Sequence, residues 1–131
     1  MVDSILSNAQ AAVINSAMEA TMILRLWRGF TDPDLSAAYE ELLTGRIAPA
    51  IMTRGVPGLH DLTVLRRHPV ELDPAEGGEV LTAMTFTDMD AVAAFTGGDP
   101  RTSVVPPAAR ALLARFDEHS QHYTTVRRFS S

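Results

Sequence analysis

An alternating segment, Thr21–Phe30 (TMILRLWRGF), constrains the fold of this chain most strongly. Successive side chains of an extended strand point to opposite faces, so the segment divides into two sets. One face would carry only apolar side chains, those of Met22, Leu24 and Leu26. The other face would carry Ile23, Arg25 and Trp27, the only tryptophan of the chain. The pattern predicts a central strand whose apolar face anchors the helices and whose other face meets a partner or lines a pocket.

Length and composition are those of one ordinary globular domain. The 131 residues are 46% apolar and 21% charged, which provides for a sizeable core. A net charge of −5 argues against a nucleic-acid partner, and the absence of cysteine excludes disulfides and thiolate chemistry. No apolar run approaches the roughly 20 residues that span a bilayer, and no secretory signal is recognisable. We therefore expect a cytoplasmic protein without membrane contact.

The first 20 residues are predicted to form a separate helical extension. Apolar residues recur at helical spacing within residues 3–20, as a shallow stripe rich in alanine. Such a stripe is marginal in water on its own, so two interpretations stay open: a frayed extension, or an arm that packs on a neighbouring subunit. The expected division is therefore an extension at 1–20 and a folded domain at 21–131.

A long helix is expected after the first strand. Asp32 and Pro33 suit an N-cap and a first helical position, and apolar residues then recur every three or four positions from Leu35 to Ile51. Pro49 lies inside this run and should kink or divide the helix, which should end at the GVPG sequence of residues 55–58.

The remaining segments complete a recognisable order. Strands are expected at Leu59–His68 and Glu79–Phe86, joined by a polar hairpin loop. A short helix should follow from Thr87 to Phe95, and the last strand should cover His119–Phe129. Between them another helix should begin at Pro106, with Leu112, Leu113 and Phe116 as its buried positions. The order is that of the ferredoxin-like βαββαβ arrangement, an α+β fold whose antiparallel sheet has the first strand in its middle.

Several runs in residues 22–126 resemble one family. They are ILRLWRGF, AAYEELL, GVPGL, VLTAMTFTDMDAVAAFTGGD, VVPPAARALLARFDE and HSQHY. These runs are similar to the sequences of small bacterial members of the antibiotic biosynthesis monooxygenase-like family. The resemblance implies a homodimer whose two sheets pack face to face as a dimeric α+β barrel, with a pocket in each subunit. The family includes oxygenases that act on polyketide-like phenols without a cofactor, so the resemblance also implies an activity class.

Dimerisation follows from the predicted fold as well. A sheet whose helices all return to one face leaves its other face bare, and apolar surface of that kind is usually buried by a partner. On the expectation that Met22, Leu24 and Leu26 anchor the helices, the bare face presents Ile23 and Trp27. A second copy of the chain is the expected partner.

Four residues are predicted to bind a small apolar or aromatic ligand: Trp27, Arg25, His60 and Tyr123. Trp27 would stack on a flat substrate or, alternatively, fill the dimer interface. Arg25, if buried, needs an anionic ligand or a carboxylate such as Glu79 or Asp61. Tyr123 has a core or interface position as its alternative.

His122 is the predicted catalytic residue. The last strand pairs with the first in the predicted fold, which would bring His122 near Arg25 or Trp27 in a suitable register. A histidine there could remove a phenolic or carbon-bound proton and create the anion that reacts with oxygen. The alternative is a structural histidine that bonds to the backbone or to Asp117.

No metal and no cofactor are expected. His60 and His68 would lie roughly 26 Å apart on one strand, and His119 and His122 would lie on opposite faces of another.

The better-known oxygenases of the family use an asparagine together with a tryptophan, and its haem-degrading members add a histidine to that pair. In this chain the only asparagines, Asn8 and Asn15, lie outside the matching region.

Three functions stay open from the sequence. The first is a small homodimeric enzyme that performs cofactor-independent oxygenation, or a related proton transfer, isomerisation or cyclisation, on an aromatic or polyketide-like molecule in a pocket between sheet and helices. The second is a non-catalytic small-molecule-binding or accessory dimer. The third is a structural interaction domain whose N-terminal helix docks into a partner.

Overall fold

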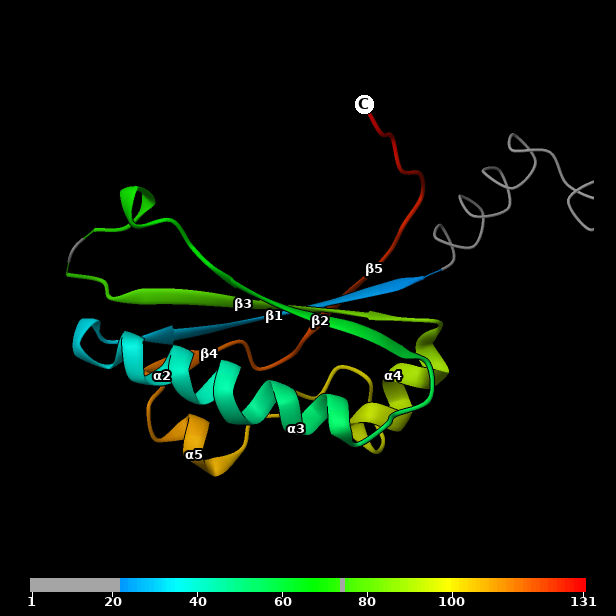
Figure 1. Ribbon diagram of the computed structural model, residues 1–131, viewed down its shortest axis with the longest axis horizontal. Helices are drawn as coiled ribbons and strands as arrows, with labels where there is room; N and C mark the ends of the chain where they lie inside the picture. The colour runs from blue at the N-terminus through cyan, green and yellow to red at the C-terminus, as the bar shows by residue number, and fades with distance from the viewer. Residues whose placement is uncertain (1–21, 74) are drawn as a thin grey trace, which may run out of the picture.

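The computed structural model describes residues 22–73 and 75–131, which form one sheet and the helices on it (Figure 1). The strands are β1 (Ile23–Thr31), β2 (Leu59–Arg66), β3 (Gly78–Phe86), β4 (Arg115–Phe116) and β5 (Gln121–Thr124). The α-helices are α2 (Ser36–Leu42), α3 (Ala48–Thr53), α4 (Met89–Thr96) and α5 (Pro107–Arg110). Short turns of other helix types are η2 (Pro33–Leu35), η3 (Leu43–Ile47) and η4 (Pro69–Glu71). The helix predicted at 3–20 lies outside the described residues.

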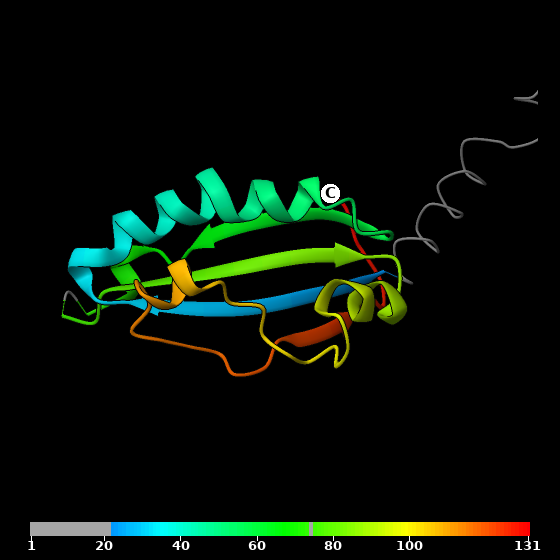
Figure 2. The same cartoon turned by 90° about the horizontal axis from the view of Figure 1, so that it is seen from below.

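The sheet confirms the predicted ferredoxin-like topology. Its order is β2-β3-β1-β4, with β5 also beside β1, and every pairing is antiparallel. The four α-helices of the described residues lie on one side of it, with α2 and α3 in line along its length, α4 at one end and α5 toward the other (Figure 2). The fold is therefore α+β, with β1 central, and within residues 22–73 and 75–131 no α-helix covers the other face of the sheet.

The prediction of which β1 face receives the helices was wrong. Ile23 and Arg25 are buried on the helix side, where Ile23 packs with Met84 and Phe86. Leu24 and Leu26 are only half-buried and point to the side without helices. Alternation groups residues by face but does not say which face is covered. Arg25 can occupy the covered face because its polar end finds partners within the fold.

The long helix passes through Pro49 without breaking. Between α2 and α3 the chain forms the π-helical turn η3, in which the Ala48 N–H donates to the carbonyl of Leu43, five residues earlier. This wider turn immediately precedes Pro49, whose ring nitrogen has no proton to donate. Such turns occur often at functional sites, and here Leu43 and Ile47 both line a cavity.

The second half of the chain differs from prediction in two places. The helix that begins at Pro107 ends at Arg110, and Phe116 lies in β4 instead of on that helix. The last strand is divided into β4 and β5 and ends at Thr124, well before Phe129. The division has a physical cause, because the carbonyl of Asp117 accepts hydrogen bonds from Trp27 Nε1 and Ser103 Oγ.

The core consists of two clusters under the helices. The cluster beneath α4 contains Ile23, Met84, Phe86, Ala91, Val92 and Phe95. The cluster beneath α2 and α5 contains Tyr39, Leu43, Val80, Val105 and Ala109. Among the described residues, no helix combines the length and the apolar character needed to cross a bilayer.

Matched phenylalanine substitutions test this assignment of the core. Phe86 is completely buried, so Phe86→Ala should lower the free energy of unfolding by about 3–5 kcal/mol in chemical denaturation. Phe129 is exposed, so Phe129→Ala should change the free energy of unfolding by no more than about 0.5 kcal/mol. Equal effects of the two substitutions would contradict the placement of the core on the helix side of β3.

Candidate functional site

A cavity lies between the sheet and the helices, where the two core clusters meet. Its wall takes Met84 and Phe95 from the first cluster and Tyr39 and Leu43 from the second. Its volume is about 50 Å³, which holds a few waters at about 10–15 Å³ each. A multi-ring ligand needs several hundred Å³, so its binding requires the wall to move apart.

Arg25 places a positive charge in this mostly apolar wall. Its side chain is on β1, only 3% of the residue is exposed, and its guanidinium lies 5.4 Å from the centre of the Phe95 ring. Nη1 donates to the carbonyl of Pro100 at 2.6 Å and Nη2 to that of Thr102 at 2.8 Å. Burial lowers the pKa of Arg25 to about 10, which leaves it charged at neutral pH.

No carboxylate of the described residues forms an ion pair with Arg25. The predicted partners do not reach it, because Glu79 pairs with Arg67 at 3.0 Å and Asp61 is exposed on β2. A buried cation that has only neutral partners is costly unless an anion joins it. Arg25 is therefore the group of the cavity best suited to hold an anionic ligand.

His122 is directly opposite Arg25 in the β1–β5 register, as the predicted pairing of first and last strands requires. Its Nε2 lies 2.9 Å from Arg25 Nη1. Since arginine can only donate, Nε2 must be the acceptor and the imidazole must carry its proton on Nδ1. Burial, followed by the charge of Arg25, lowers the pKa of His122. The histidine is not part of the cavity wall, and it reaches the cavity through Arg25.

Trp27 forms part of the wall and faces the helices. Its Nε1 donates to the carbonyl of Asp117 at 2.9 Å and lies 3.0 Å from Ser103 Oγ. Its ring tilts against Phe116, with the ring centres 5.8 Å apart. These contacts fix the indole in place. Because it lies on the covered side of the sheet, the alternative in which Trp27 fills an interface on the bare face is wrong.

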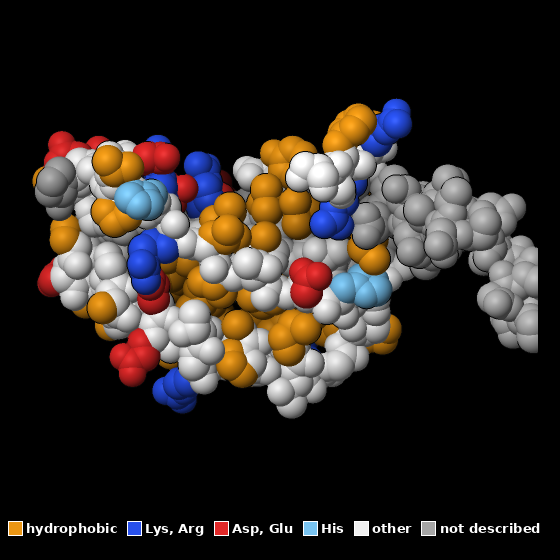
Figure 3. All heavy atoms as spheres, turned by 45° about the horizontal axis from the view of Figure 1, so that its top comes forward, with side chains coloured by type: hydrophobic (Ala, Val, Ile, Leu, Met, Phe, Trp, Pro, Cys, Tyr) orange, Lys and Arg blue, Asp and Glu red, His pale blue; other side chains and the backbone are white. Residues whose placement is uncertain are grey.

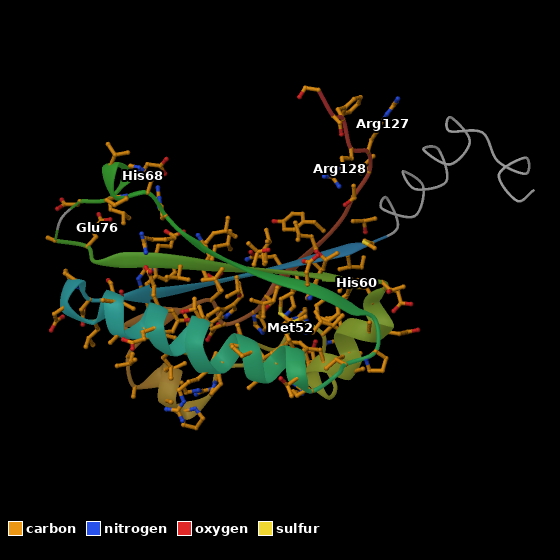
Figure 4. The ribbon with its side chains drawn as sticks, viewed as in Figure 1. Met52, His60, His68, Glu76, Arg127 and Arg128 are labelled. Atoms are coloured by element: carbon orange, nitrogen blue, oxygen red, sulfur yellow. The ribbon has the colours of Figure 1, made fainter. Side chains whose placement is uncertain are left out.

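His60 and Tyr123, two of the predicted ligand-binding residues, lie outside the cavity. His60 is exposed at an irregularity in the β2–β3 register, and a ring nitrogen lies 2.6 Å from Thr87 Oγ1. His60 and His68 occupy opposite ends of the sheet (Figure 4). Tyr123 is opposite Leu24, so it points to the face without helices, where it is 54% exposed. Neither residue lines the cavity, and within residues 22–73 and 75–131 no three His, Cys, Asp or Glu side chains group as a metal site would.

Tyr39 and Ser120 also line the cavity, although neither is among the site residues predicted from the sequence. Tyr39 on α2 is 1% exposed, and burial raises its pKa to about 12. Ser120, just before β5, is 4% exposed, and its hydroxyl has no hydrogen-bond partner in the described structure. Tyr39 fits the apolar spacing of its helix, which indicates a core position and not a functional one. Nothing in the local sequence distinguishes Ser120.

Solved structures of similar fold cover most of this chain. SnoaB, a cofactor-independent oxygenase from Streptomyces nogalater, is 19% identical, with a TM-score of 0.52 over 84% of this chain and 96% of its own. A candidate antibiotic biosynthesis monooxygenase from Bacillus cereus is 15% identical, with a TM-score of 0.57 over 85% and 97%. A monooxygenase from the ActVA-Orf6 gene of Streptomyces coelicolor, solved with nanaomycin D, is 17% identical, with a TM-score of 0.52 over 90% and 96%.

The fold is that of the antibiotic biosynthesis monooxygenase-like proteins. No family model and no curated protein matches the sequence itself. At identities below 20% these structures establish the architecture and leave the chemistry to be argued from the residues of the cavity.

The contact between His122 and Arg25 predicts a pH dependence of stability. The pKa of His122 is lower in the folded chain than its unfolded value of about 6.5, so the unfolded chain takes up the proton first as the pH falls. The stabilisation is therefore complete above about pH 6.5 and is lost below it. Between about pH 6.5 and 5, the free energy of unfolding should fall more steeply for the unmodified protein than for His122→Gln.

The matched control is His68→Gln, because His68 is exposed at the far end of the sheet. Each variant loses one histidine, so the difference between the slopes of the two variants isolates the contact of His122 with Arg25. A His122→Gln slope equal to that of the unmodified protein would contradict the assigned tautomer and contact.

Proposed function

We propose that this chain is a small homodimeric enzyme that oxygenates an aromatic or polyketide-like molecule without a cofactor, or performs a related proton transfer, isomerisation or cyclisation on it. The cavity between the sheet and the helices is the proposed site. The observation that carries the proposal is Arg25, a buried cation in a mostly apolar wall that has no carboxylate partner among the described residues. SnoaB, a cofactor-independent oxygenase, has the same fold and lends support by analogy.

The chemistry suits a substrate that reacts as an anion. A phenol or an activated C–H group that has lost its proton is the electron-rich form that reacts with molecular oxygen. The charge of Arg25 would favour that form, because an electrostatic interaction is stronger in an apolar site than in water. Trp27 would form one wall against a flat ring system.

We assign His122 a positioning role within this proposal, in place of the general base predicted from the sequence. Its Nε2 lone pair is already engaged by Arg25, and Nδ1 carries the proton. The histidine therefore holds the guanidinium in place as the carbonyls of Pro100 and Thr102 do. The substrate's proton would then be lost to water, with Arg25 lowering the pKa of the bound substrate.

The second candidate is a non-catalytic small-molecule-binding or accessory dimer. The small volume of the cavity favours it, as does the absence of an unengaged base among the described residues of the wall. The asparagine that the family's better-known oxygenases use is missing from residues 22–131. Both candidates share an anion bound at Arg25, and they differ in whether oxygen is consumed.

The homodimer is proposed from the open face, the side of the sheet without helices. Its apolar members are Leu24, Leu26, Leu65, Leu81 and Tyr123, of which Leu65 and Tyr123 are exposed. The strand register places Leu81 opposite Leu65 and Leu24 opposite Tyr123, and Leu26 follows Leu24 on the same face of β1. Hydrophobic side chains gather over the middle of this face (Figure 3). A second copy of the same face would cover it, as in the face-to-face barrel that the resemblance implies.

Substitution of Arg25 tests the site. Arg25→Gln should weaken binding of 2-naphthoate by about 10- to 100-fold in calorimetry, because a charged hydrogen bond is lost. Oxygen uptake with a dihydroxynaphthalene should fall in parallel if the protein is an enzyme. Arg66→Gln is the matched control, since Arg66 is exposed and pairs with Glu40. Unchanged naphthoate affinity in Arg25→Gln would overturn the proposed site, and binding without any oxygen uptake would favour the second candidate.

A charge in the open face tests the dimer. Leu26→Glu would bury a carboxylate in the middle of the proposed interface, so sedimentation velocity should show twice the 14.2 kDa chain for the unmodified protein and one chain for the variant. Val70→Glu, at a position 81% exposed in η4, should leave the dimer intact. A monomeric unmodified protein would contradict the proposal.

A further inference from the structure

Ser120 carries a buried hydroxyl group without a hydrogen-bond partner. The residue is 4% exposed, and its Oγ has no partner in the part of the chain that the structure describes. Buried polar side chains are normally hydrogen-bonded, and an exception in a native structure calls for an explanation, of which a bound ion is one. Ser120 lines the same cavity as Arg25. Its hydroxyl is therefore available to an ion or molecule inside that cavity.

Arg25 and Ser120 are neighbours across the β1–β5 pairing. The register places Arg25 opposite His122, which follows Ser120 by two residues, so Ser120 lies diagonally from Arg25. Diagonal neighbours of this kind are about 7–8 Å apart, a span that a long side chain such as arginine can cover. The backbone N–H of Ser120 also donates to the carbonyl of Arg101, in the loop whose carbonyls bind the Arg25 guanidinium.

Two N–H groups of the Arg25 guanidinium have no hydrogen-bond partner among the described residues. A guanidinium has five N–H donors and no acceptor. Nη1 uses two of them, on the Pro100 carbonyl and on His122 Nε2, and Nη2 uses one on the Thr102 carbonyl. No Asp or Glu of the described residues lines the cavity. Donors with an uncompensated positive charge suit a ligand that is anionic and only accepts hydrogen bonds.

The size of the cavity restricts what this ligand can be. The volume is about 50 Å³, and one water needs about 10–15 Å³ of it. A halide ion is only slightly larger than a water molecule, so one halide fits without movement of the wall. It would also neutralise one positive charge and so offset the cost of burying Arg25, whereas a water would leave that charge uncompensated.

We propose that the cavity binds one halide ion, such as chloride, between the Arg25 guanidinium and the Ser120 hydroxyl when no larger ligand is bound. The halide is the counter-ion of Arg25, and the anionic group of a larger ligand replaces it. The inference shares Arg25 with the proposed function, but it requires neither oxygen chemistry nor an aromatic ligand. One consequence is that chloride competes with any larger anion for the cavity.

Trp27 provides an internal reporter, because it is the only tryptophan of the chain and lines the same cavity. Bromide quenches indole fluorescence on contact, whereas chloride does not. Titration of the unmodified protein with sodium bromide, at an ionic strength held constant with sodium gluconate, should give quenching that saturates, and added chloride should reverse it. Arg25→Gln should show only the linear quenching that collisions with ions in solution produce.

Ser120→Ala should keep the saturable quenching but bind bromide about two- to tenfold more weakly, as the loss of one hydrogen bond predicts. Ser130→Ala is the matched control, since Ser130 is exposed and its loss should leave the bromide affinity unchanged. Circular dichroism checks the folding of each variant, and Ser120→Ala keeps the test decisive if Arg25→Gln does not fold. Linear quenching in the unmodified protein, or an unchanged bromide affinity in Ser120→Ala, would overturn the inference.

Competition separates this inference from the proposed function. Chloride should weaken the binding of 2-naphthoate in calorimetry, because both anions need Arg25. Binding of 2-naphthoate that chloride does not affect, together with linear bromide quenching, would overturn the halide site and leave the proposed function standing. Saturable bromide quenching without any binding of 2-naphthoate would support the halide site and overturn the proposed function.

Discussion

The rest of the cavity depends on how Arg25 is held. A guanidinium from the middle of the central strand is buried under the helices, where it binds two carbonyls of the 97–106 loop and a ring nitrogen of His122. These bonds join β1, that loop and β5 at one point. They engage three of the five N–H donors of the guanidinium and provide no negative charge, so the electrostatic cost of burial is only partly offset. An apolar site with an uncompensated cation is suited to an anion.

Trp27, two residues further along β1, also binds a segment that is distant in the sequence. Its indole N–H binds the carbonyl of Asp117, and Ser103 Oγ binds the same carbonyl. That carbonyl is consequently unavailable to the sheet, and the last strand is interrupted between β4 and β5. Ser120 lies in the interrupted segment and reaches the cavity. The side chains of one face of β1 therefore determine both the wall of the cavity and the path of the chain around it.

The cavity lies between two core clusters, so some of the residues that stabilise the fold also form the wall of the proposed site. Each cluster is closed by its own helix, α4 at one end and α2 with α5 at the other. The helix that spans both ends contains the π-helical turn η3 at the cavity itself. The open face plays no part in this wall, because its side chains point away from the cavity.

The sequence by itself determined the order of elements, the central position of β1 and the set of residues that share a face with Arg25, because strand alternation and helical spacing are local properties of the chain. It also indicated that His122 would lie near Arg25. Only the tertiary structure decided which face of β1 the helices cover, since that choice depends on whether Arg25 and Trp27 find partners far along the chain. The same long-range contacts brought Tyr39 and Ser120 into the cavity and kept His60 and Tyr123 out of it.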